Sequence, residues 1–374
     1  MLIRNDGNGT VMKFKVPKSK LFESLSAVQN VVGTRAALPV LSNVLISAED
    51  GRLVFTTTDL DITIRCSCEA EVEVEGKVTL PVKKLASIVK ELDDGIVKVQ
   101  VDENDSAHMR CGSYKSKIIG LSAREFPQAP TTEDSICYKI DQGRFRDMLK
   151  KTYYAAATDD SRPILTGVLL SFAEGKLICV ATDGRRLALY ESEVDFPVEN
   201  SRDLVLPPRA VGELMRALGD SGELTISLKD KQLIFEFNDI FFCCKLLNGV
   251  YPNYKQVVLK NCSNVITINR EELLAVLRRI NASTTNTANA MRLTFENNML
   301  TITVSSTEIG DATDTVAIKY EGETLSAIFN PEFMMDPLKN LTSDEIQIEL
   351  NNSSSPGLIK SDIPFLYVIM PLRV

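Results

Sequence analysis

The sequence predicts an α+β fold in which three tandem copies of one unit each pack two helices on a curved antiparallel sheet. Three observations support this prediction. A segment recurs at an offset of about 124 residues, short alternating strands fill most of the chain, and every copy holds two helix patterns. The length of 374 residues suits two to four domains at roughly 100–200 residues each.

The repeat is clearest between LPVLSNVLISAEDGRLVFTTTD (38–59) and RPILTGVLLSFAEGKLICVATD (162–183). Leu41 aligns with Leu165, and Asp59 aligns with Asp183. A weaker third copy, MRLTFENNMLTITVSS (291–306), has asparagine in place of the turn glycine. Similarity at a fixed offset indicates a repeat architecture, so we expect three units of one fold.

The first helix of each copy follows an alternating strand and a polar or proline turn. The three segments are KFKVPKSKLFESL (13–25), YKIDQGRFRDML (138–149) and TINREELLAVL (267–277). Each has an apolar pair at i and i+4, the spacing of one helix face. The pairs are Leu21/Leu25, Phe145/Leu149 and Leu273/Leu277. Asp141 and Asn269 precede the latter two helices and are the predicted N-caps.

The second helix of each copy begins beside a proline, which the first helical turn tolerates because its missing N–H would be unpaired there. The segments are VTLPVKKLASIVKEL (78–92), LVLPPRAVGELMRAL (204–218) and IFNPEFMMDPLKNL (328–341), and a further strand follows each. Pro337 lies inside the last segment, so we expect that helix to be kinked or shortened near Asp336.

These patterns divide the chain into four parts. We expect an N-terminal extension over residues 1–11, a first domain over 12–130, a second domain over 131–256 and a third domain over 257–374. The expected linkers are 127–137 and 252–264.

Composition narrows the functions that are open to this chain. The single histidine, His108, rules out His-rich zinc sites and lies in a stretch typical of an exposed strand. The eight cysteines form no C-x-x-C pair, so we expect free thiols in a reducing cytoplasm, no metal and no cofactor. No apolar run is long enough to span a membrane, and the first residues lack the apolar core of a signal peptide.

Charge is distributed unevenly between the helices and the rest of the chain. The net charge is −8, yet the predicted helices together hold 15 basic and 9 acidic residues. These helices are 18–33, 82–92, 141–156, 208–218, 269–282 and 331–341. Basic helices on an acidic body suit contact with a polyanion, although helix surfaces are often rich in Lys and Arg without such a role.

Repetition suggests what the polyanion could be. Three similar units joined with a constant rotation would curve, and two such chains joined head to tail would close into a six-domain ring lined by helices. The sequence holds no helix-turn-helix, zinc finger or other base-reading motif. We therefore expect a sleeve that holds duplex DNA through its phosphates, independently of base sequence.

Two other interpretations remain open. In a repeat-built enzyme, Asp59, Asp61 and Asp183 would bind a metal or act as acid and base. Asp59 and Asp183 recur at equivalent turns, where Asp is common, whereas a catalytic site needs unlike groups that converge. The chain could also be a three-domain scaffold, even at the cell surface, although the free cysteines and the missing signal sequence argue against that location.

Several segments resemble one protein family. ATDGRRLAL (181–189) is similar to the family's ATDGHRLA, and VIMPLRV (368–374) to its VVMPMRL; LPVLSNVL near the start and YPNY (251–254) match as well. The family is the bacterial DNA polymerase III β subunit, the replicative sliding clamp, and the resemblance runs from about Met12 to Val374. It implies three DNA-clamp domains per chain and a head-to-tail homodimeric ring around duplex DNA.

The resemblance also implies a function and a set of partners. Clamps of this family tether the replicative polymerase and give it processivity, and they have no catalytic activity. A clamp loader opens and places the ring using ATP, and this sequence itself has no G-x-x-x-x-G-K-[ST] loop. The expected partners are double-stranded DNA, a second copy of the chain, the DNA polymerase III catalytic subunit, the clamp loader and other proteins with a clamp-binding motif, and no membrane.

The family's partner pocket lies between the second and third domains and takes a short peptide, typically a Gln followed by apolar residues and often a Phe. Carried over to this sequence, the pocket would use Arg162, Leu165, Thr182, Gly184, Arg185, Arg186, Leu187, Pro252, Val257, Asn330, Phe333, Val368, Met370, Pro371, Leu372 and Arg373. The Leu, Val and Met side chains would form an apolar cup, and Met suits a pocket with many partners. The C-terminal run would equally fit a last core strand.

The chain departs from the family pattern at three places. Arg185 stands where the family often has His, so the rim of the pocket is more cationic. Phe333 replaces the usual Tyr and lacks its hydroxyl. The segment 281–290 (NASTTNTANA) is small and polar where some relatives have apolar dimer contacts, so the resemblance implies the ring but leaves the strength of its dimer open.

For DNA, the family places basic residues on inner helices and adjoining loops. Arg35 matches an arginine on such a loop. The other expected DNA-binding residues are Lys83, Lys84, Lys150, Lys151, Arg209, Arg278 and Arg279. Direct contacts of this kind weaken steeply with salt, whereas a topologically closed ring would be retained.

Overall fold

The computed structural model describes residues 9–33, 38–128, 130, 136–159, 161–194, 196, 201–229, 231–258, 262–283, 290–306 and 310–372. Its contacts group the chain into two compact units. Unit 1 spans Met1–Gly143 and Gly212–Leu246, and unit 2 spans Arg144–Val211 and Leu247–Val374. Among the described residues, no helix has both the length and the apolar character needed to cross a membrane.

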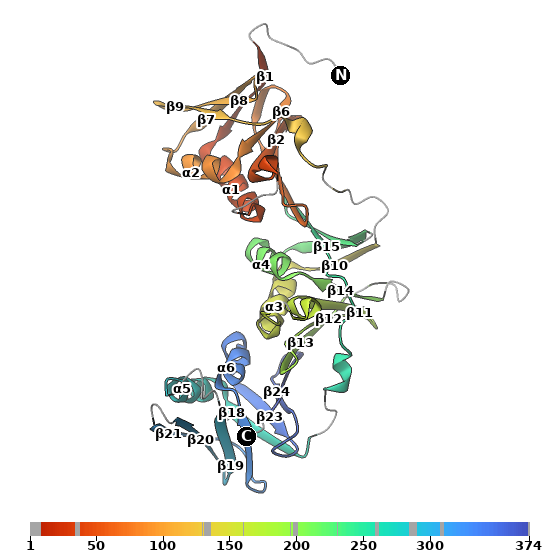
Figure 1. Ribbon diagram of the computed structural model, residues 1–374, viewed down its shortest axis with the longest axis vertical. Helices are drawn as coiled ribbons and strands as arrows, with labels where there is room; N and C mark the ends of the chain where they lie inside the picture. Colours follow the sequence, from red (N-terminus) through yellow and green to blue (C-terminus); the bar gives the residue numbers. More distant parts are fainter. Residues whose placement is uncertain are drawn as a thin grey trace. The chain divides into compact units, whose positions relative to one another are not determined.

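Unit 1 is built on two antiparallel sheets (Figure 1). The five-stranded sheet has the order β5(Glu71–Val74), β1(Thr10–Pro17), β7(Ile96–Asp102), β8(Ser106–Cys111), β9(Tyr114–Ile119). The eight-stranded sheet has the order β10(Ile136–Asp141), β15(Glu223–Lys229), β16(Gln232–Phe237), β17(Ile240–Lys245), β4(Ile62–Glu69), β3(Arg52–Thr58), β2(Asn43–Glu49), β6(Gly76–Pro81). The helices α1(Lys18–Val28) and α2(Val82–Glu91) pack against each other, and α1 also packs on β3 and β4.

Unit 2 repeats this plan. Its eight-stranded sheet has the order β14(Arg202–Leu206), β11(Val168–Ala173), β12(Lys176–Thr182), β13(Arg186–Glu193), β25(Phe365–Ile369), β24(Gly357–Lys360), β23(Glu345–Leu350), β18(Asn264–Asn269). Its four-stranded sheet has the order β21(Gly310–Ala317), β20(Met299–Ser306), β19(Met291–Glu296), β22(Leu325–Phe329). The helices α5(Arg270–Asn281) and α6(Pro331–Asn340) pack together. The helices α3(Gln142–Thr152) and α4(Pro208–Ala217) each begin in one unit and end in the other.

Both eight-stranded sheets join strands from two copies of the repeat. In unit 1, β17 pairs with β4, and Phe242 lies opposite Ile64. In unit 2, β13 pairs with β25, and Leu187 lies opposite Val368. The two units therefore divide the second copy, with β10 and β15 to β17 in unit 1 and β11 to β14 in unit 2. The domain limits drawn from the repeat stay a prediction.

All six helices that the sequence predicts are present; α1 and α3 end five and four residues before their predicted limits, each followed by a 3₁₀ turn, and the other limits differ by at most one residue. Both members of each apolar i, i+4 pair are buried, as a helix packed by one face requires. Asn269 is confirmed as an N-cap, because its side chain accepts a hydrogen bond from the backbone N–H of Glu272 at 3.0 Å. Asp141 stands before α3, and its carboxylate accepts from the N–H of Gly222.

Pro337 does not shorten α6, which continues to Asn340. A proline cannot donate to the carbonyl four residues earlier, which here belongs to Phe333. The hydroxyl of Tyr367 on β25 donates to that carbonyl oxygen at 2.8 Å instead. Of the kink or shortening expected near Asp336, the shortening is therefore wrong, because a neighbouring strand supplies the missing donor, and the kink stays a prediction.

The first strand begins before the predicted start of the first domain. β1 opens at Thr10, which pairs with Asp102 and is 3% exposed. The last two residues of the extension predicted over 1–11 thus belong to the sheet. Residues 1–8, Arg35, Arg373 and the stretch 284–289 of the polar segment lie outside the described residues.

Candidate functional site

An apolar pocket of about 160 Å³ opens in unit 2, where β13 begins beside the end of β25. Its lining, within the described part of the chain, includes eleven residues that the sequence predicted: Arg162, Leu165, Thr182, Gly184, Arg185, Arg186, Leu187, Pro252, Val257, Val368 and Met370. Leu165, Leu187 and Val368 are buried at 1–3% exposure. Val257 and Met370 are 40% and 41% exposed. A concave apolar surface with polar groups beside it suits an apolar ligand side chain.

A tight turn before β13 shapes one wall of the pocket. The Asp183 carboxylate accepts hydrogen bonds from the backbone N–H groups of Arg185 at 2.8 Å and Arg186 at 3.0 Å. Gly184 has a φ of +87°, which favours glycine. A Cβ at Gly184 would lie 2.9 Å from the guanidinium of Arg162. That guanidinium donates to the carbonyl oxygen of Asp183 at 2.8 Å, so the turn and the arginine fix each other.

Arg186 is the most constrained charged side chain in the pocket wall, with 10% of its side chain exposed. Its Nε donates to Asp183 at 3.1 Å, its Nη1 to Asp336 on α6, and its Nη2 to the carbonyl oxygen of Tyr154 at 2.8 Å. The Phe333 ring centroid lies 4.2 Å from the guanidinium carbon, a cation–π distance. Arg186 therefore ties β13, α6 and the 3₁₀ turn Tyr153–Ala155 after α3 together behind the apolar cup.

Four described residues that the sequence predicted for the pocket do not line it. Asn330 caps α6, because its side chain accepts from the N–H groups of two following residues. Phe333 supports the guanidinium of Arg186 from behind. Leu372 donates its backbone N–H to Ile328 at 2.8 Å and, like Pro371, lies outside the lining.

Sequence reasoning missed two lining residues, Asn253 and Tyr254. Both belong to the YPNY segment, of which only the proline was selected. Burial raises the pKa of Tyr254, whose side chain is 8% exposed. An aromatic residue between two turn residues was the available signal, because such a ring commonly anchors a loop on a sheet.

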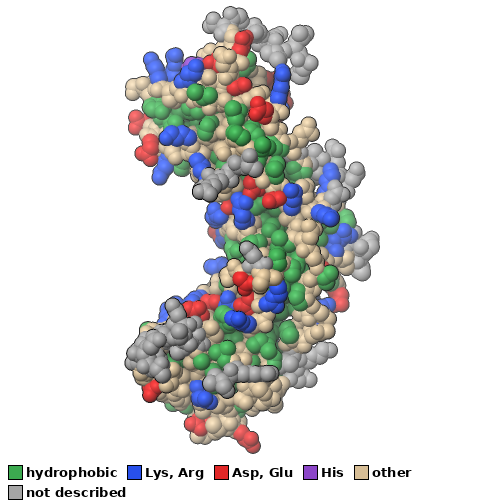
Figure 2. Space-filling model, in the orientation of Figure 1, with side chains coloured by type: hydrophobic (Ala, Val, Ile, Leu, Met, Phe, Trp, Pro, Cys, Tyr) green, Lys and Arg blue, Asp and Glu red, His purple; other side chains and the backbone are tan. Residues whose placement is uncertain are grey.

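The basic residues proposed for DNA contact fall into two groups. Lys83 and Lys84 on α2, Lys150 on α3, Arg209 on α4 and Arg278 on α5 are exposed. Figure 2 shows Lys and Arg side chains on the surface around α2. Arg279 is also exposed, but it donates to Asp314 on β21 at 2.7 Å.

Lys151 is buried, which argues against the DNA contact that the sequence predicts for it. Its side chain is 6% exposed, it pairs with Asp147 one turn earlier, and its ammonium lies 5.7 Å from the Tyr190 ring centroid. The position lies three residues after Met148, at the edge of the apolar face of α3, so the helix turns it away from solvent.

The aspartates considered for catalysis hold turns. Asp59 accepts from the N–H groups of Asp61 at 3.0 Å and Ile62 at 2.7 Å, as Asp183 does in the second copy. Asp61 pairs with Lys245 at 3.1 Å. Among the described residues, no group of three or more His, Cys, Asp or Glu side chains could hold a metal ion. His108 is a surface residue, 3.3 Å from Asp102.

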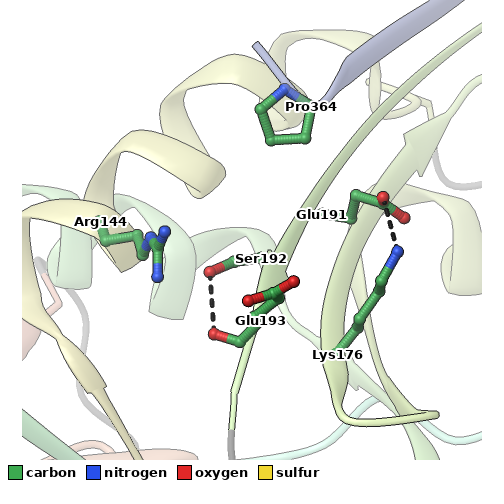
Figure 3. Close-up of a pocket in the computed structure, with 6 residues that line it drawn as sticks. All are labelled: Arg144, Lys176, Glu191, Ser192, Glu193 and Pro364. Atoms are coloured by element: carbon green, nitrogen blue, oxygen red, sulfur yellow. Dashed lines mark hydrogen bonds and ion pairs between the residues drawn. The ribbon is translucent and has the colours of Figure 1, made fainter.

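A second cavity of unit 2 has a charged lining and a volume of about 200 Å³ (Figure 3). Lys176 and Glu191 form an ion pair across 2.9 Å on its wall. The Ser192 hydroxyl donates to the backbone oxygen of Glu193 at 3.3 Å, and Arg144 faces them from α3. The wall groups thus pair with one another, and this cavity lacks the apolar floor of the first pocket.

The chain matches three domains of one family over nearly its whole length. These are the N-terminal domain of the DNA polymerase III beta subunit over residues 12–130, its central domain over 139–253 and its C-terminal domain over 255–373.

Individual proteins agree with this match. The chain is 32% identical to the "Beta sliding clamp" of Chlamydia trachomatis, covering 97% of this chain and 88% of the relative, and 30% identical to that of Bacillus subtilis, covering 97% and 100%. The crystal structure of the Bacillus subtilis sliding clamp superposes with a TM-score of 0.93 at 29% identity over 97% of this chain and 99% of that one. A Bartonella birtlesii clamp bound to griselimycin gives 0.92 at 30% identity over 97% and 100%.

Proposed function

The chain belongs to the family of DNA polymerase III beta subunits, the bacterial sliding clamps, and we propose which of its surfaces carry out the functions of a clamp. The protein is a DNA sliding clamp, a non-catalytic processivity factor. The interpretations of the chain as an enzyme or as a purely structural scaffold are therefore wrong. The surfaces that we propose are the apolar pocket, the basic helices and two sheet edges.

The apolar pocket of unit 2 is the docking site for the peptide motif of partner proteins. The observation that carries this proposal is the combination of a buried floor formed by Leu165, Leu187 and Val368 with two apolar side chains left exposed at its mouth. Burying an apolar anchor there gains roughly 1.5–3 kcal/mol for a Leu- or Phe-sized side chain. The partners that present such a peptide are the DNA polymerase III catalytic subunit, the clamp loader and other motif-bearing proteins.

A matched pair of variants tests the pocket. Met370→Glu places a charge at the mouth, and we expect it to weaken binding of a fluorescent peptide with a Gln-apolar-Phe motif at least tenfold. Met299→Glu makes the same change at an equally exposed methionine, 40% against 41%, on β20 of the same unit. Equal affinity of the two variants for the peptide would show that the pocket is not its binding site.

The exposed basic residues of the helices contact duplex DNA through its phosphates. Lys83, Lys84, Lys150, Arg209 and Arg278 carry this role, because each is exposed on one of the basic helices. Arg279 contributes only where DNA competes with Asp314 for its guanidinium. Such contacts are independent of sequence and are weakened by salt.

Two copies associate head to tail through sheet edges. β9 lies at one edge of its sheet and presents Ile119, 75% exposed, beside Lys115 and Lys117. β21 lies at the edge of the four-stranded sheet and carries Asp311 and Asp314. Exposed strand edges are templates for pairing, and opposite charges fix the register. Ile119→Asp is expected to shift the mass measured by mass photometry from dimer to monomer; an unchanged dimer would exclude β9 from the interface.

The assembled ring is tested by retention on DNA. After loading by a clamp loader with ATP, the protein should stay on circular duplex in high salt and leave linear duplex through its ends. Equal loss from both would mean simple electrostatic binding. We also propose a cytoplasmic location, because none of the eight cysteines, all of which the structure describes, forms a disulfide, as a reducing compartment would ensure.

A further inference from the structure

A larger groove of about 570 Å³ lies beside the peptide pocket in unit 2. The residues of this groove that matter here are Leu169, Ser171, Arg202, Asp203, Tyr254 and Lys255. Leu169 and Ser171 alternate on β11, and Asp203 lies opposite Ser171 on β14, so these three side chains share one face of the sheet. The groove has room for a short stretch of peptide.

The groove and the peptide pocket share a wall. Pro252, Asn253 and Tyr254 line both cavities. A peptide anchored in the pocket by its apolar side chains therefore has to continue only across this three-residue ridge to reach the groove. The two cavities form one continuous surface on which a longer partner segment can lie.

Tyr254 is a buried residue of the wall that the two cavities share. Tyr254 is 8% exposed, and its hydroxyl oxygen is closed to solvent, with the Ser171 hydroxyl as its neighbour. Burial raises the pKa of Tyr254, the Ser171 hydroxyl lowers it, and the Asp203 carboxylate raises it. Ser171 and Asp203 line the groove and not the pocket, so the hydroxyl lies on the groove side. A bound segment therefore meets the exposed side chains of the groove and not this buried hydroxyl.

The charges around both cavities favour an acidic segment. Lys255 is exposed at the groove, and Arg202 lines it; Arg162 and Arg185 are exposed at the pocket. Asp203 is the acidic residue of the groove lining and can accept hydrogen bonds from peptide N–H groups. A carboxylate placed near Lys255 would form a charge-assisted hydrogen bond, which is stronger than a neutral one.

We propose that this groove binds the segment of a partner chain that directly flanks the anchored peptide motif, and that it selects an acidic residue there. The acidic side chain pairs with Lys255, while the Asp203 carboxylate accepts a hydrogen bond from a peptide N–H of the same segment. This inference rests on the proposed function of the pocket. It adds a specificity element that would let the clamp rank partners whose core motifs are alike.

Four synthetic peptides test the inference by fluorescence anisotropy: a core Gln-apolar-Phe motif, the core with two Asp residues added at its C-terminal side, the core with two Asp residues added at its N-terminal side, and the core with two Ala residues added at each side. We expect one of the acidic peptides to bind the unaltered protein five- to tenfold more tightly than the core and the alanine peptide. The gain should shrink in 500 mM salt, because Lys255 is exposed.

Single substitutions in the protein show which residues cause the tighter binding of the acidic peptide. Lys255→Glu should abolish it while leaving the affinity for the core peptide unchanged, because Lys255 does not line the pocket. Lys319→Glu makes the same charge change at an exposed lysine elsewhere in unit 2 and should preserve the gain.

Each alternative outcome overturns a distinct part of the argument. If neither acidic extension improves binding, or if the gain survives Lys255→Glu, the groove does not select acidic flanks. If Lys319→Glu abolishes the gain as well, only the overall charge of the protein matters. If the core peptide binds and Met370→Glu leaves it bound, the proposed pocket fails, and this inference fails with it.

Discussion

Replacing Arg186 should loosen the packing behind the peptide pocket more than it changes the pocket's apolar surface. Arg186→Met keeps the length of the side chain and removes its charge, its three hydrogen-bonded partners and its contact with Phe333. Asp183 and Asp336 would then lose their shared arginine while only 18% and 24% exposed.

The loss in the free energy of unfolding that Arg186→Met causes depends on the partners that the two carboxylates keep. Removing one partner of a fully buried ion pair costs about 3–5 kcal/mol. Here Asp183 retains two backbone N–H donors, and Asp336 retains Lys339 at 3.3 Å. We therefore expect a loss of about 2–3 kcal/mol, below the fully buried range. Asp336→Asn added to Arg186→Met should cost at least about 1 kcal/mol less than the sum of the single changes, because it removes the unpaired charge.

Native-state hydrogen exchange of the amides in β13 and β25 measures the loss of stability around Arg186 directly. It does not assume that the two units unfold together. A loss of 2–3 kcal/mol corresponds to exchange about 30- to 150-fold faster. Lys319→Met is the matched control, because it breaks an exposed ion pair with Glu345 in the same unit and should cost less than about 1 kcal/mol. Exchange that is as slow in Arg186→Met as in the control, or costs that simply add in the double variant, would refute the reasoning.

Three further predictions address the turn, the helices and the thiols. Gly184→Ala combines a φ of +87° with a methyl group 2.9 Å from an arginine nitrogen, so titration calorimetry should show peptide binding weakened about tenfold; unchanged affinity would mean the turn adapts. Lys150→Glu should lower the salt slope of DNA binding by about 1, whereas Lys151→Met should leave that slope unchanged and destabilise the fold instead; equal slopes would remove Lys150 from the DNA surface. Burial raises the pKa of Cys66 and of Cys243 from an ordinary 9.0 to about 12, so their contribution to stability is present below pH 9 and is lost as the pH rises toward 12. The urea midpoint should fall over that range, and Cys66→Ala should lessen the fall; a flat profile would contradict the burial of these thiols.

Much of the fold could be predicted from local patterns. The helices were found because their apolar pairs at i and i+4 and the adjoining prolines are local signals, and all six lie where these signals place them. The pairing of β17 with β4 and of β13 with β25 had no such signal, because the paired segments lie far apart in sequence. Local patterns also failed to separate Lys150 from Lys151. The two lysines are adjacent in sequence, yet the helix directs Lys150 toward solvent and Lys151 toward the Tyr190 ring.

The candidate pocket was predictable chiefly through resemblance to a family, and the supporting contacts were not. Asp336, Tyr154 and Phe333 hold Arg186 from three different segments, and no spacing rule connects them. The same applies to Tyr367, whose hydroxyl replaces the hydrogen bond that Pro337 cannot make. These contacts arise only when α6 has packed beside β25.

The repeat also provides a physical comparison for the pocket, because unit 1 builds the same turn and strand pair. In unit 1 the backbone N–H of Lys245 donates to the carbonyl oxygen of Asp61 at 2.9 Å; in unit 2 that of Met370 donates to Arg185, also at 2.9 Å. The equivalent side chains differ in kind. Asp61 and Lys245 form an ion pair at the position where unit 2 leaves the Met370 side chain exposed beside an arginine.

Two residues further along each strand, the side chains of unit 1 are again more polar than those of unit 2. Thr63 lies opposite Cys243 in unit 1, where Leu187 lies opposite Val368 in unit 2. Shorter and more polar side chains at these positions offer less apolar area to an incoming Leu or Phe, and affinity for such an anchor scales with the apolar area buried. Repetition thus supplies the backbone of a docking site twice, and substitution at a few register positions gives unit 2 an apolar pocket and unit 1 a polar, charge-paired surface.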